Sequence, residues 1–547
     1  MQQNARSRWK QAAALLAIVA LAGLLRFEGM AWDDGILPHP DERYLTMVAS
    51  ALHEGKLTAA GRDAAQRAAR QAACAARNPG TAGVGGWFDT ACSDFNPANV
   101  GHPNYPYGQL PLATVRLAAE AAAVVTGDAT LRAYGGIQLV GRALSAIADL
   151  LTLLITFQLG RQLWGRAVGL LGAAFYAVAV LPIQAAHFFT VDSWVTLFAA
   201  VALLFAIRLA RFGHRQDALA FGAAYGLALA AKVSIAPLVL VLPLAAYWAP
   251  RRVAFAGRPD VLTRVAVLLP ELLLAALGAL ITFRFAAPYA FAGPAWHDFL
   301  PAPGFVDTVL ESRRLASGEV DIPPNWQWLG RTAWLWPAQN LVVWGLGVPL
   351  GLAVVAGLSC RGWRLVRATR VERARALAWL WVVGMFAWLG QQWVASMRYF
   401  LPLYPVACLF AAGWLLPWWR AGRLAGSPRS RRLVPAVLAG GVLLATVAWA
   451  FAFHRVHTTL HPYAAATAWV LRNVPAPVSA DLSPAAGERT LVNWPAAGEF
   501  RADGPPRVAA TTVAPSSGRI EAVRLHRVLP VAGDGVLRFA LRVLGAD

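Results

Sequence analysis

Charged residues are scarce in this 547-residue chain. Only 14% of its residues are Asp, Glu, Lys or Arg, whereas 57% are hydrophobic, and the mean hydropathy is +0.48. Soluble domains contain about 25% charged residues. This scarcity excludes an ordinary soluble protein, and many apolar runs reach the roughly 20 residues that a membrane-spanning helix requires. The composition therefore predicts a multi-pass membrane protein.

Acidic residues are fewer than basic ones, 29 against 49, which gives a formal charge of +20. Such a charge suits a nucleic-acid partner. The arginines, however, concentrate in the short connections between apolar runs, as signals of membrane topology do. We therefore interpret the charge as a signal of orientation in the membrane and expect no nucleic-acid partner.

Cysteine is rarer still, with four in the chain, which is too few for a disulfide scaffold. Cys74 and Cys92 share one polar segment and can form a disulfide if that segment lies outside the cytoplasm. Cys360 and Cys408 fall in or beside apolar runs. Several functional motifs are also absent: we find no Gly-rich nucleotide loop, no Ser-His-Asp order and no cluster with structural zinc spacing.

The apolar runs predict about eleven membrane spans. The first follows a basic flank, "MQQNARSRWK", and shows no convincing small-residue cleavage site, so we expect it to be retained. The expected spans cover residues 11–30, 134–159, 167–187, 193–210, 217–231, 233–249, 265–285, 333–357, 377–395, 400–419 and 433–453.

The basic residues predict the orientation of these spans. With the N-terminus in the cytoplasm, every Arg-rich connection falls on the cytoplasmic side, as the positive-inside rule requires. This solution places residues 31–132, the loop near 286–332 and the tail outside the cytoplasm. It gives a membrane domain over residues 1–453 and an extracytoplasmic domain over residues 454–547.

The first outer loop contains two patterns of amphipathic helices. Apolar residues recur at helical spacing from Asp41 to about Leu52, and a second such helix begins at Gln109; both are typical of helices at a membrane surface. In the tail, "HPYAAATAWVLRNVP" predicts one more helix. Short alternating runs follow, clearest in "VLRFALRV" after an "AGDG" turn, and predict a small domain with β structure.

The segment "GILPHPDERYLTMVASALHEG" places two adjacent carboxylates, Asp41 and Glu42, where the first span meets water. Acids after a proline at a helix start are typical of capping and of the helix dipole. The alternative is a general base: a hydroxyl that attacks a sugar C1 must lose its proton, and one carboxylate can accept it. A phosphate leaving group departs without protonation, so a second, acidic carboxyl is unnecessary.

Several other charged side chains are expected at the outer ends of spans, where topology does not explain them. The cations are Arg43, Lys232, Arg284, Arg331 and Arg398. They suit a phosphate on a lipid tail, whose charge lies at headgroup level, although each is also compatible with a side chain that extends from a helix end to water. Asp192 fits either a site carboxylate or an ordinary N-cap, and His187 either a ligand or a packed histidine.

These segments resemble the polyprenyl-phosphate-sugar-dependent glycosyltransferases of the GT-C fold, in particular the protein O-mannosyltransferases and the lipid A aminoarabinose transferases. The matching stretches are "HPDERYL", "FNPANVGHPNYPYGQLPLATVRL", "HFFTVDSW", "LALAAKVS", "QWLGRTAWLWPAQNLVVWGLGVPLGL", "MRYFLPLYPVACLFAAGWL" and "HPYAAATAWVLRNVP". They extend over roughly residues 1–475 in family order. The final part of the chain is shorter than the outer domain usual in the family.

The resemblance implies roles for these residues. It implicates Asp41 as the catalytic carboxylate with Glu42 beside it, Asp192 as a second acid, and Lys232 and Arg398 as ligands of the carrier phosphate, with Arg284 and Arg331 as weaker matches. Further substrate-binding candidates are His39, Arg43, Tyr107, His187 and Tyr399.

We therefore expect a plasma-membrane glycosyltransferase that works on the extracytoplasmic face. It would transfer one hexose or pentose, such as mannose, from a polyprenyl phosphate to an acceptor hydroxyl, with inversion and with Asp41 as base. We expect no cofactor and no obligatory metal, because cationic side chains can neutralise the phosphate. The partners would be the lipid-linked donor, membrane lipids and a protein, lipid or glycan acceptor. The rival classes are a lipid or sugar transporter, which would carry broken polar helices at the bilayer midplane, and an inactive accessory subunit.

Overall fold

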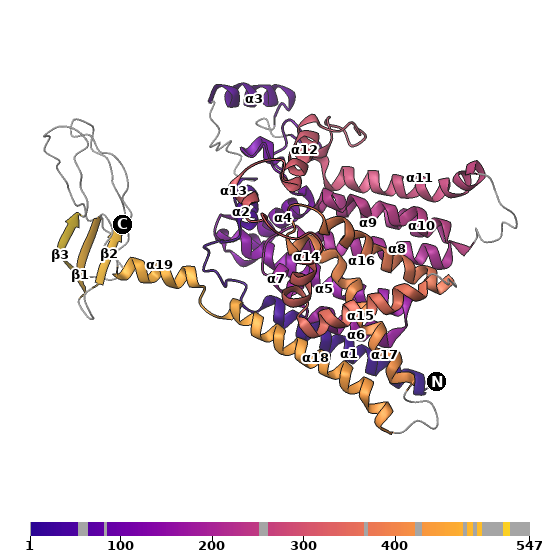
Figure 1. The fold of residues 1–547 in the computed structure, drawn as a ribbon. Helices are drawn as coiled ribbons and strands as arrows, with labels where there is room; N and C mark the ends of the chain where they lie inside the picture. The colour runs from indigo at the N-terminus through magenta and orange to yellow at the C-terminus, as the bar shows by residue number, and fades with distance from the viewer. Residues whose placement is uncertain are drawn as a thin grey trace. The chain divides into compact units, whose positions relative to one another are not determined.

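The computed structural model describes residues 2–52, 64–80, 85–250, 261–365, 370–421, 429–473, 478–484, 490–494 and 518–525. The described part is almost entirely helical (Figure 1). It divides into two units: unit 1 contains residues 1–31 and 37–458, and unit 2 contains residues 32–36 and 459–547.

The helices of unit 1 follow one another in this order: α1 (Gln2–Phe27), α2 (Pro40–Ala51), α3 (Ala64–Arg77), η1 (Pro97–Val100), α4 (Gln109–Thr126), η2 (Ala129–Arg132), α5 (Ile137–Leu163), α6 (Arg166–Ala177), α7 (Val180–Ala186), α8 (Asp192–Phe212), α9 (Arg215–Ala231), η3 (Val233–Leu240), α10 (Val241–Tyr247) and α11 (Val261–Ala286). They continue with η5 (Pro288–Ala290), α12 (Pro303–Ser317), α13 (Pro323–Trp326), α14 (Leu335–Asn340), the π-helical turn η6 (Leu341–Gly345), α15 (Val348–Leu365), α16 (Arg370–Gly390), η7 (Met397–Leu403), α17 (Tyr404–Ala421) and α18 (Arg429–Thr458).

Six helical segments among the described residues are long and apolar enough to cross a membrane. They are Trp9–Phe27, Ile137–Leu163, Asp192–Phe212, Leu268–Ala286, Met397–Leu416 and Val437–Val470. The pair α6 and α7, bent by 59°, makes a seventh if it counts as one span. Pro182 accounts for the break between α6 and α7, because it lacks the N–H that would bond to Val178 across the junction.

The expected count of eleven spans therefore stays a prediction. Helices occupy the remaining expected spans, and two of these spans are interrupted. The expected span 233–249 is the 3-10 segment η3 followed by α10, and the expected span 333–357 is divided into α14, η6 and α15. Pro237 lies inside η3, and Gly347, at φ +81°, separates η6 from α15. Proline and a left-handed glycine both end regular α-helix locally.

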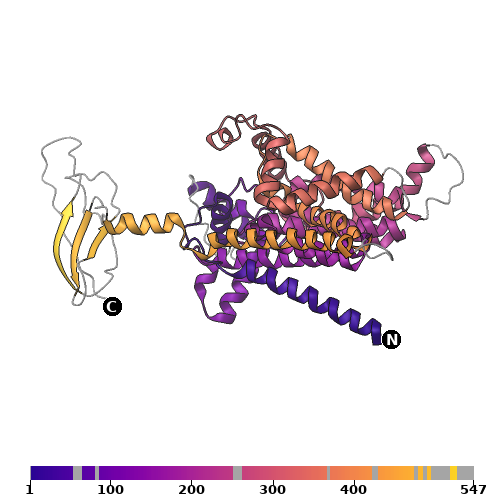
Figure 2. The ribbon, with the colours of Figure 1, turned by 60° about the horizontal axis from the view of Figure 1, so that its bottom comes forward.

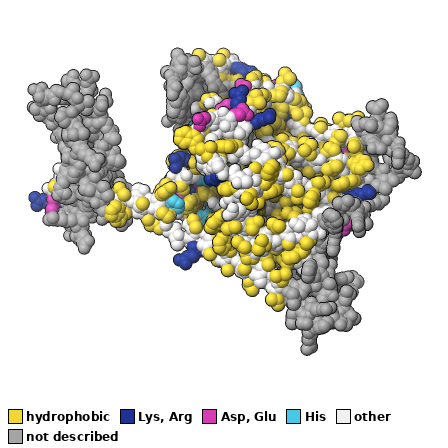
Figure 3. All heavy atoms as spheres, in the orientation of Figure 1, with side chains coloured by type: hydrophobic (Ala, Val, Ile, Leu, Met, Phe, Trp, Pro, Cys, Tyr) yellow, Lys and Arg dark blue, Asp and Glu magenta, His cyan; other side chains and the backbone are white. Residues whose placement is uncertain are grey.

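Small residues allow close helix packing within unit 1. A Cβ atom built on Gly222 of α9 would lie 2.0 Å from the carbonyl oxygen of Ala275 in α11. Such contacts are typical of membrane helices, which gain stability from close backbone approach rather than from the hydrophobic effect. On its other side α11 exposes Leu269, Leu273 and Leu277. Figure 3 shows hydrophobic side chains over much of the visible face, as expected of a surface in contact with lipid.

The helices of the loop between the first two expected spans lie at one end of the long helices. In Figures 1 and 2, α2 and α4 lie at the end of the bundle opposite to the N-terminus of α1. The two expected surface helices correspond to α2 and α4, which begin at Pro40 and Gln109. In α2, Leu45 and Val48 are buried and Met47 is exposed, as the amphipathic pattern requires.

Unit 2 contains α19 (Pro462–Asn473) and the strands β1 (Val478–Pro484), β2 (Thr490–Trp494) and β3 (Gly518–Leu525). The strands form one antiparallel sheet in the order β2-β1-β3, with an irregular register between Asp481 and Leu482. The expected helix over 461–475 corresponds to α19. The expected strand "VLRFALRV" (536–543) and the turn "AGDG" (532–535) lie outside the described residues.

Candidate active site

The first turn of α2 is fixed by its own cap. His39 is the N-cap residue, and its Nδ1 accepts a hydrogen bond from the N–H of Glu42 at 3.4 Å. Pro40 occupies the first helical position, where its missing N–H costs nothing. The guanidinium of Arg43 donates to the carbonyl oxygen of Leu37 at 3.0 Å. The candidate base Asp41 therefore sits on a rigid helix start.

Asp41 forms an ion pair with Arg398, which comes from η7 near the other end of the sequence. Its Oδ2 lies 2.6 Å from Nη1 of Arg398, and the two side chains are 18% and 24% exposed. The same Nη1 lies 3.4 Å from Nε2 of His39. The pair is thus shielded but open to solvent, as a reacting group that must meet a ligand requires.

A second pair, Asp192 with Lys232, lies beside the first. Nζ of Lys232 is 2.6 Å from Oδ1 of Asp192 and 4.3 Å from the ring centre of Tyr399. The guanidinium of Arg398 lies 5.6 Å from the same ring and also interacts electrostatically with Asp192. The structure therefore joins the two carboxylates and the two cations around Tyr399.

Gly108 allows the loop before α4 to approach Lys232. A Cβ built on Gly108 would lie 2.1 Å from the carbonyl oxygen of Ala231, the residue that precedes Lys232. No larger side chain fits there without moving the backbone. This close approach brings Tyr107, next to Gly108, to the group around Asp41.

Tyr107 packs with two further tyrosines. The ring centres of Tyr44, Tyr105 and Tyr107 lie 5.8–6.2 Å from one another. Burial raises the pKa of Tyr107, and the negative charge of Asp41 and a hydrogen bond with it raise that pKa further. Tyr107 is therefore a neutral phenol at neutral pH, and its O–H is available as a donor to the Asp41 carboxylate.

Burial also affects His39. It lowers the pKa of the imidazole below the usual 6.5, and the positive charge of Arg398 lowers it further, against the opposing charges of Asp41 and Asp192. His39 is therefore neutral at neutral pH, which its Nδ1 must be to accept the cap hydrogen bond.

Glu42 has a different environment from its neighbour. It is fully buried, and its two oxygens accept bonds from Nε and Nη2 of Arg142 at 2.7 and 2.9 Å. Oε1 also accepts the N–H of Phe189 at 2.8 Å, while Arg142 donates to the carbonyl oxygen of Met30 at 2.6 Å. This carboxylate joins α2 to α5 and to the loop before α8. All of these contacts are to buried groups, whereas the Asp41–Arg398 pair is partly exposed.

The remaining candidates lie in other surroundings. Arg284 is buried and donates to the carbonyl oxygens of Pro288 and Ala295, which orders the loop after α11. Arg331 is exposed between the rings of Trp328 and Trp336, at 4.7 and 4.2 Å. His187 lies with two other histidines rather than with Asp41.

Sequence reasoning missed Arg142 and a second buried group within the bundle. There, Asp149 accepts bonds from Arg26 and Tyr176, each at 2.5 Å, and Arg26 donates to the carbonyl oxygen of Ala177 at 2.8 Å. The sequence does indicate that Arg26, Arg142 and Asp149 have partners, because a charged residue inside an apolar run needs one. It does not indicate which residues these partners are, because the two members of each pair come from different helices.

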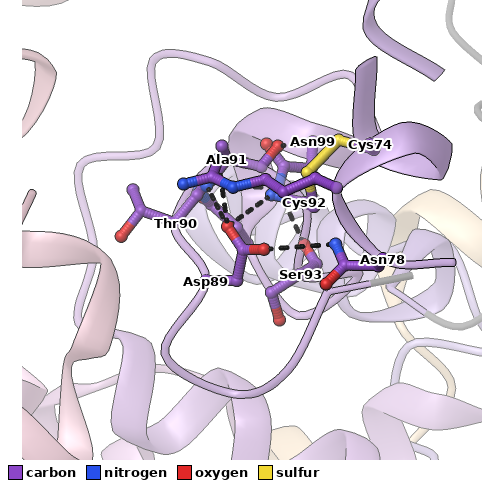
Figure 4. Close-up of a disulfide and its surroundings, with 10 residues drawn as sticks. Cys74, Asn78, Asp89, Thr90, Ala91, Cys92, Ser93 and Asn99 are labelled. Atoms are coloured by element: carbon purple, nitrogen blue, oxygen red, sulfur yellow. Dashed lines mark hydrogen bonds and ion pairs between the residues drawn. A yellow bond between two sulfur atoms is a disulfide. The ribbon is translucent and has the colours of Figure 1, made fainter. Parts of the chain in front are cut away.

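The loop between α2 and α4 contains a disulfide between Cys74 and Cys92, drawn in Figure 4. Asp89 organises the same loop: its Oδ1 accepts the N–H groups of Ala91 and Cys92, and its Oδ2 accepts the amide of Asn78. A groove of about 430 Å³ lies beside this loop, lined among others by Asp89, Asn96, Asn99, Tyr105 and Tyr289. Tyr105 thus lines the groove and also packs against Tyr107, which interacts with Asp41.

Residues 129–270 match the family model of the dolichyl-phosphate-mannose-protein mannosyltransferases. This match covers about a quarter of the chain and agrees with the expected resemblance to the protein O-mannosyltransferases. The matched segment contains Asp192 and Lys232, whereas Asp41 and Arg398 lie outside it. No curated protein matches the chain in sequence.

Three solved structures illustrate the range of similarity. The apo oligosaccharyltransferase of Archaeoglobus fulgidus has a TM-score of 0.49 and 16% identity over 85% of this chain, which spans 58% of that protein's length. Apo ArnT from Cupriavidus metallidurans has a TM-score of 0.46 and 16% identity, over 83% of this chain and 76% of ArnT. The Pmt1-Pmt2 complex of S. cerevisiae, bound to its sugar donor, has a TM-score of 0.31 and 14% identity over 52% and 35% of the two chains.

Proposed function

We propose that this protein is an integral membrane glycosyltransferase that moves a sugar from a polyprenyl phosphate to an acceptor hydroxyl. The observation that carries the proposal is the pairing of Asp41 with Arg398 beside Asp192 and Lys232, at the end of the bundle where α2 and α4 lie. Two carboxylates and two cations cancel in charge. The site is therefore poised to exchange one carboxylate–cation contact for a phosphate–cation contact.

Arg398 is the residue at which this exchange would occur. A donor phosphate that approaches Arg398 and Lys232 competes with Asp41 for the guanidinium, since a phosphate accepts two parallel hydrogen bonds from arginine. When Arg398 turns to the phosphate, the carboxylate of Asp41 loses its partner and becomes a stronger base. Binding of the donor would thereby activate the base that the reaction needs.

The transfer then follows from the positions of these groups. The acceptor oxygen attacks C1 of the sugar while its proton passes to Asp41. The bond from C1 to the phosphate oxygen breaks, and its electron pair stays on the phosphate, whose added negative charge Arg398 and Lys232 neutralise. Attack opposite to the leaving group inverts C1. Tyr107 would hold Asp41 through its hydrogen bond, and we place the acceptor in the groove beside the disulfide, which Tyr105 connects to the site.

Glu42 has no proton-transfer role in this scheme. It is fully buried, with its oxygens engaged by Arg142 and Phe189, so no acceptor hydroxyl reaches it. We assign the whole reaction to the extracytoplasmic face of the plasma membrane, in agreement with the orientation expected from the arginine distribution.

The decisive experiment uses the full-length protein in sealed liposomes with radiolabelled polyprenyl-phosphate sugars and cell-envelope acceptors. We expect transfer by the wild type and a fall of about 10²-fold or more for Asp41→Asn, the usual contribution of a general base. The control is Asp128→Asn, which changes an exposed acid at the start of η2. Transfer by Asp41→Asn at the wild-type rate would refute the assignment, and translocation of the labelled lipid without transfer would identify a transporter.

A chelator tests the expectation that side chains alone neutralise the phosphate. We expect transfer to be independent of Mg²⁺ and Mn²⁺. Activity that is lost in EDTA and returns with either of these ions would show that the phosphate is held by a metal.

A further inference from the structure

Three buried histidines from distant parts of the sequence meet where α7, α18 and the end of α1 come together. His187 follows α7, and His454 and His457 lie three residues apart on one face of α18. Their exposed fractions are 0%, 3% and 3%, and one ring nitrogen of each lies within 4.8 Å of the others. The rings of His187 and His457 are stacked at 3.8 Å.

Glu28, just after α1, brings oxygen ligands to the same place. Its carboxylate Oε2 lies 3.2 Å from Nε2 of His454, and its backbone oxygen lies 2.9 Å from Nε2 of His187. Around a tetrahedral zinc ion, neighbouring nitrogen and oxygen ligands are about 3.3 Å apart. The two contacts of Glu28 therefore have the spacing of neighbouring ligands, whereas the three ring nitrogens, which lie within 4.8 Å of one another, need to approach by up to about 1.5 Å.

Both ring nitrogens of His187 lie beside backbone oxygens, which fix the orientation of the ring. Its Nδ1 lies 2.8 Å from the carbonyl oxygen of Ile183, and its Nε2 faces the carbonyl oxygen of Glu28. A neutral imidazole has one N–H, so only one of the two nitrogens can donate. When Nδ1 donates to Ile183, the lone pair of Nε2 is left for a metal ion, and this is the tautomer that a backbone carbonyl oxygen fixes in metal-binding histidines.

The backbone is also shaped for this convergence. A Cβ built on Gly29 would lie 2.2 Å from the carbonyl oxygen of His457, and Gly29 has φ +77°. Only glycine fits this position without strain. Gly29 therefore allows α18 to approach the end of α1 closely enough for His457 and Glu28 to share one site.

We propose that His187, His454, His457 and Glu28 bind one zinc ion. Imidazole with one carboxylate is a ligand set typical of zinc, and the half-exposed side chain of Glu28 gives the ion a path from solvent. The ion is distinct from the Asp41–Arg398 pair and takes no part in the transfer. The ion would affect the position of α2 indirectly. Phe188 and Phe189 follow His187 in the chain; Phe188 packs against His39 at 4.9 Å, and the N–H of Phe189 donates to Glu42. Zinc would link α18 to the segment from His187 to Phe189, which contacts the start of α2.

The test measures metal rather than activity, so it is independent of the proposed function. The full-length protein, purified with a tag that contains no histidine, is analysed by inductively coupled plasma mass spectrometry after equilibration with zinc. We expect about one zinc ion per chain in the wild type and at least a tenfold loss in His454→Ala/His457→Ala. His214→Ala, at an exposed histidine that precedes α9, should retain the metal.

Thermal unfolding provides a second measurement, in case the double variant folds poorly. We expect EDTA to lower the Tm of the wild type and zinc, but not magnesium, to restore it, while Glu28→Gln responds less to both. Substitution by Co²⁺ should give the visible absorption of a tetrahedral site. A wild type that binds no zinc and keeps its Tm in EDTA, or a double variant that binds zinc as the wild type does, overturns the proposal.

Discussion

Arg398 interacts with two carboxylates, Asp41 and Asp192. In the proposed reaction it is the residue that exchanges a carboxylate for the donor phosphate. We expect Arg398→Ala to lower the rate of sugar transfer by about 10²-fold, the usual cost of losing one donor to developing negative charge. Arg398→Lys should restore part of the rate, because a lysine keeps the charge but loses the paired hydrogen bonds. The measurement is the steady-state rate as a function of donor concentration.

The matched control for this prediction is Arg313→Ala, which removes an exposed arginine of α12. We expect it to leave the rate unchanged. Equal losses in the two arginine variants would mean that the effect comes from net surface charge rather than from the contacts of Arg398.

Glu42 and Asp41 are neighbours in sequence but should respond differently to substitution. Glu42→Gln leaves the guanidinium of Arg142 buried without its charge partner, which typically costs about 3–5 kcal/mol. We expect a lower Tm and less folded protein in detergent, whereas Asp41→Asn should unfold as the wild type does. If Glu42→Gln folds normally but does not transfer sugar, then Glu42 is the base and our assignment of Asp41 is wrong.

His39 makes the stability of the protein sensitive to acid. The folded state holds the pKa of His39 below 6.5, so the unfolded chain binds a proton more readily than the folded one. Stability should therefore be lost as the pH falls below about 6.5, until the lower pKa of the folded state is passed. His39→Asn keeps an acceptor at the cap but does not titrate. We expect its Tm to fall less than that of the wild type between pH 7 and 5. An equal fall in Tm for the two proteins over this range would contradict the prediction.

At the scale of elements, the loop between α2 and α4 depends on one covalent link. The disulfide closes a loop of 18 residues, and a loop of this length is stabilised by about 3 kcal/mol through restriction of the unfolded chain. We expect Cys74→Ser/Cys92→Ser to expose the segment around Asp89 to proteases while the spans stay intact. Limited proteolysis with mass spectrometry of the fragments measures this.

The same measurement reports on the location of the loop. In protein isolated under oxidising conditions, both cysteines should be found in the linked peptide. Free thiols at Cys74 and Cys92 would contradict an extracytoplasmic loop, because the cytoplasm keeps such pairs reduced.

Local pattern was sufficient to predict the elements that carry the site. The helices expected from Asp41 and from Gln109 begin at Pro40 and Gln109 in the structure. Caps, prolines and apolar periodicity each depend on a few neighbouring residues, so the start of a helix can be predicted from the sequence alone. Interrupted spans such as η3 with α10 were harder to predict, because hydropathy averaged over a window does not register one proline or one left-handed glycine.

For the whole molecule, the arginine distribution makes a prediction about orientation that Cys360 can test. This cysteine is free and exposed on α15, whereas Cys408 is buried. With the N-terminus in the cytoplasm, the end of α15 is cytoplasmic as well. A membrane-impermeant thiol reagent should therefore leave Cys360 unlabelled in intact cells and label it after lysis. Labelling of intact cells would reverse the orientation and place Asp41 inside.

The sequence by itself determined the membrane class, the expected orientation, the helix that bears Asp41, and a set of charged residues at one membrane boundary. Composition and local periodicity carry this information, because each depends on residues near one another in the chain. Only the tertiary structure separated Asp41 from Glu42. It did so through Arg398 and Arg142, which lie on other helices and give one carboxylate a shielded but open pair and the other a fully buried one. It also brought His187 to His454 and His457, since the packing of helices, not spacing along the chain, decides which polar groups share a buried site.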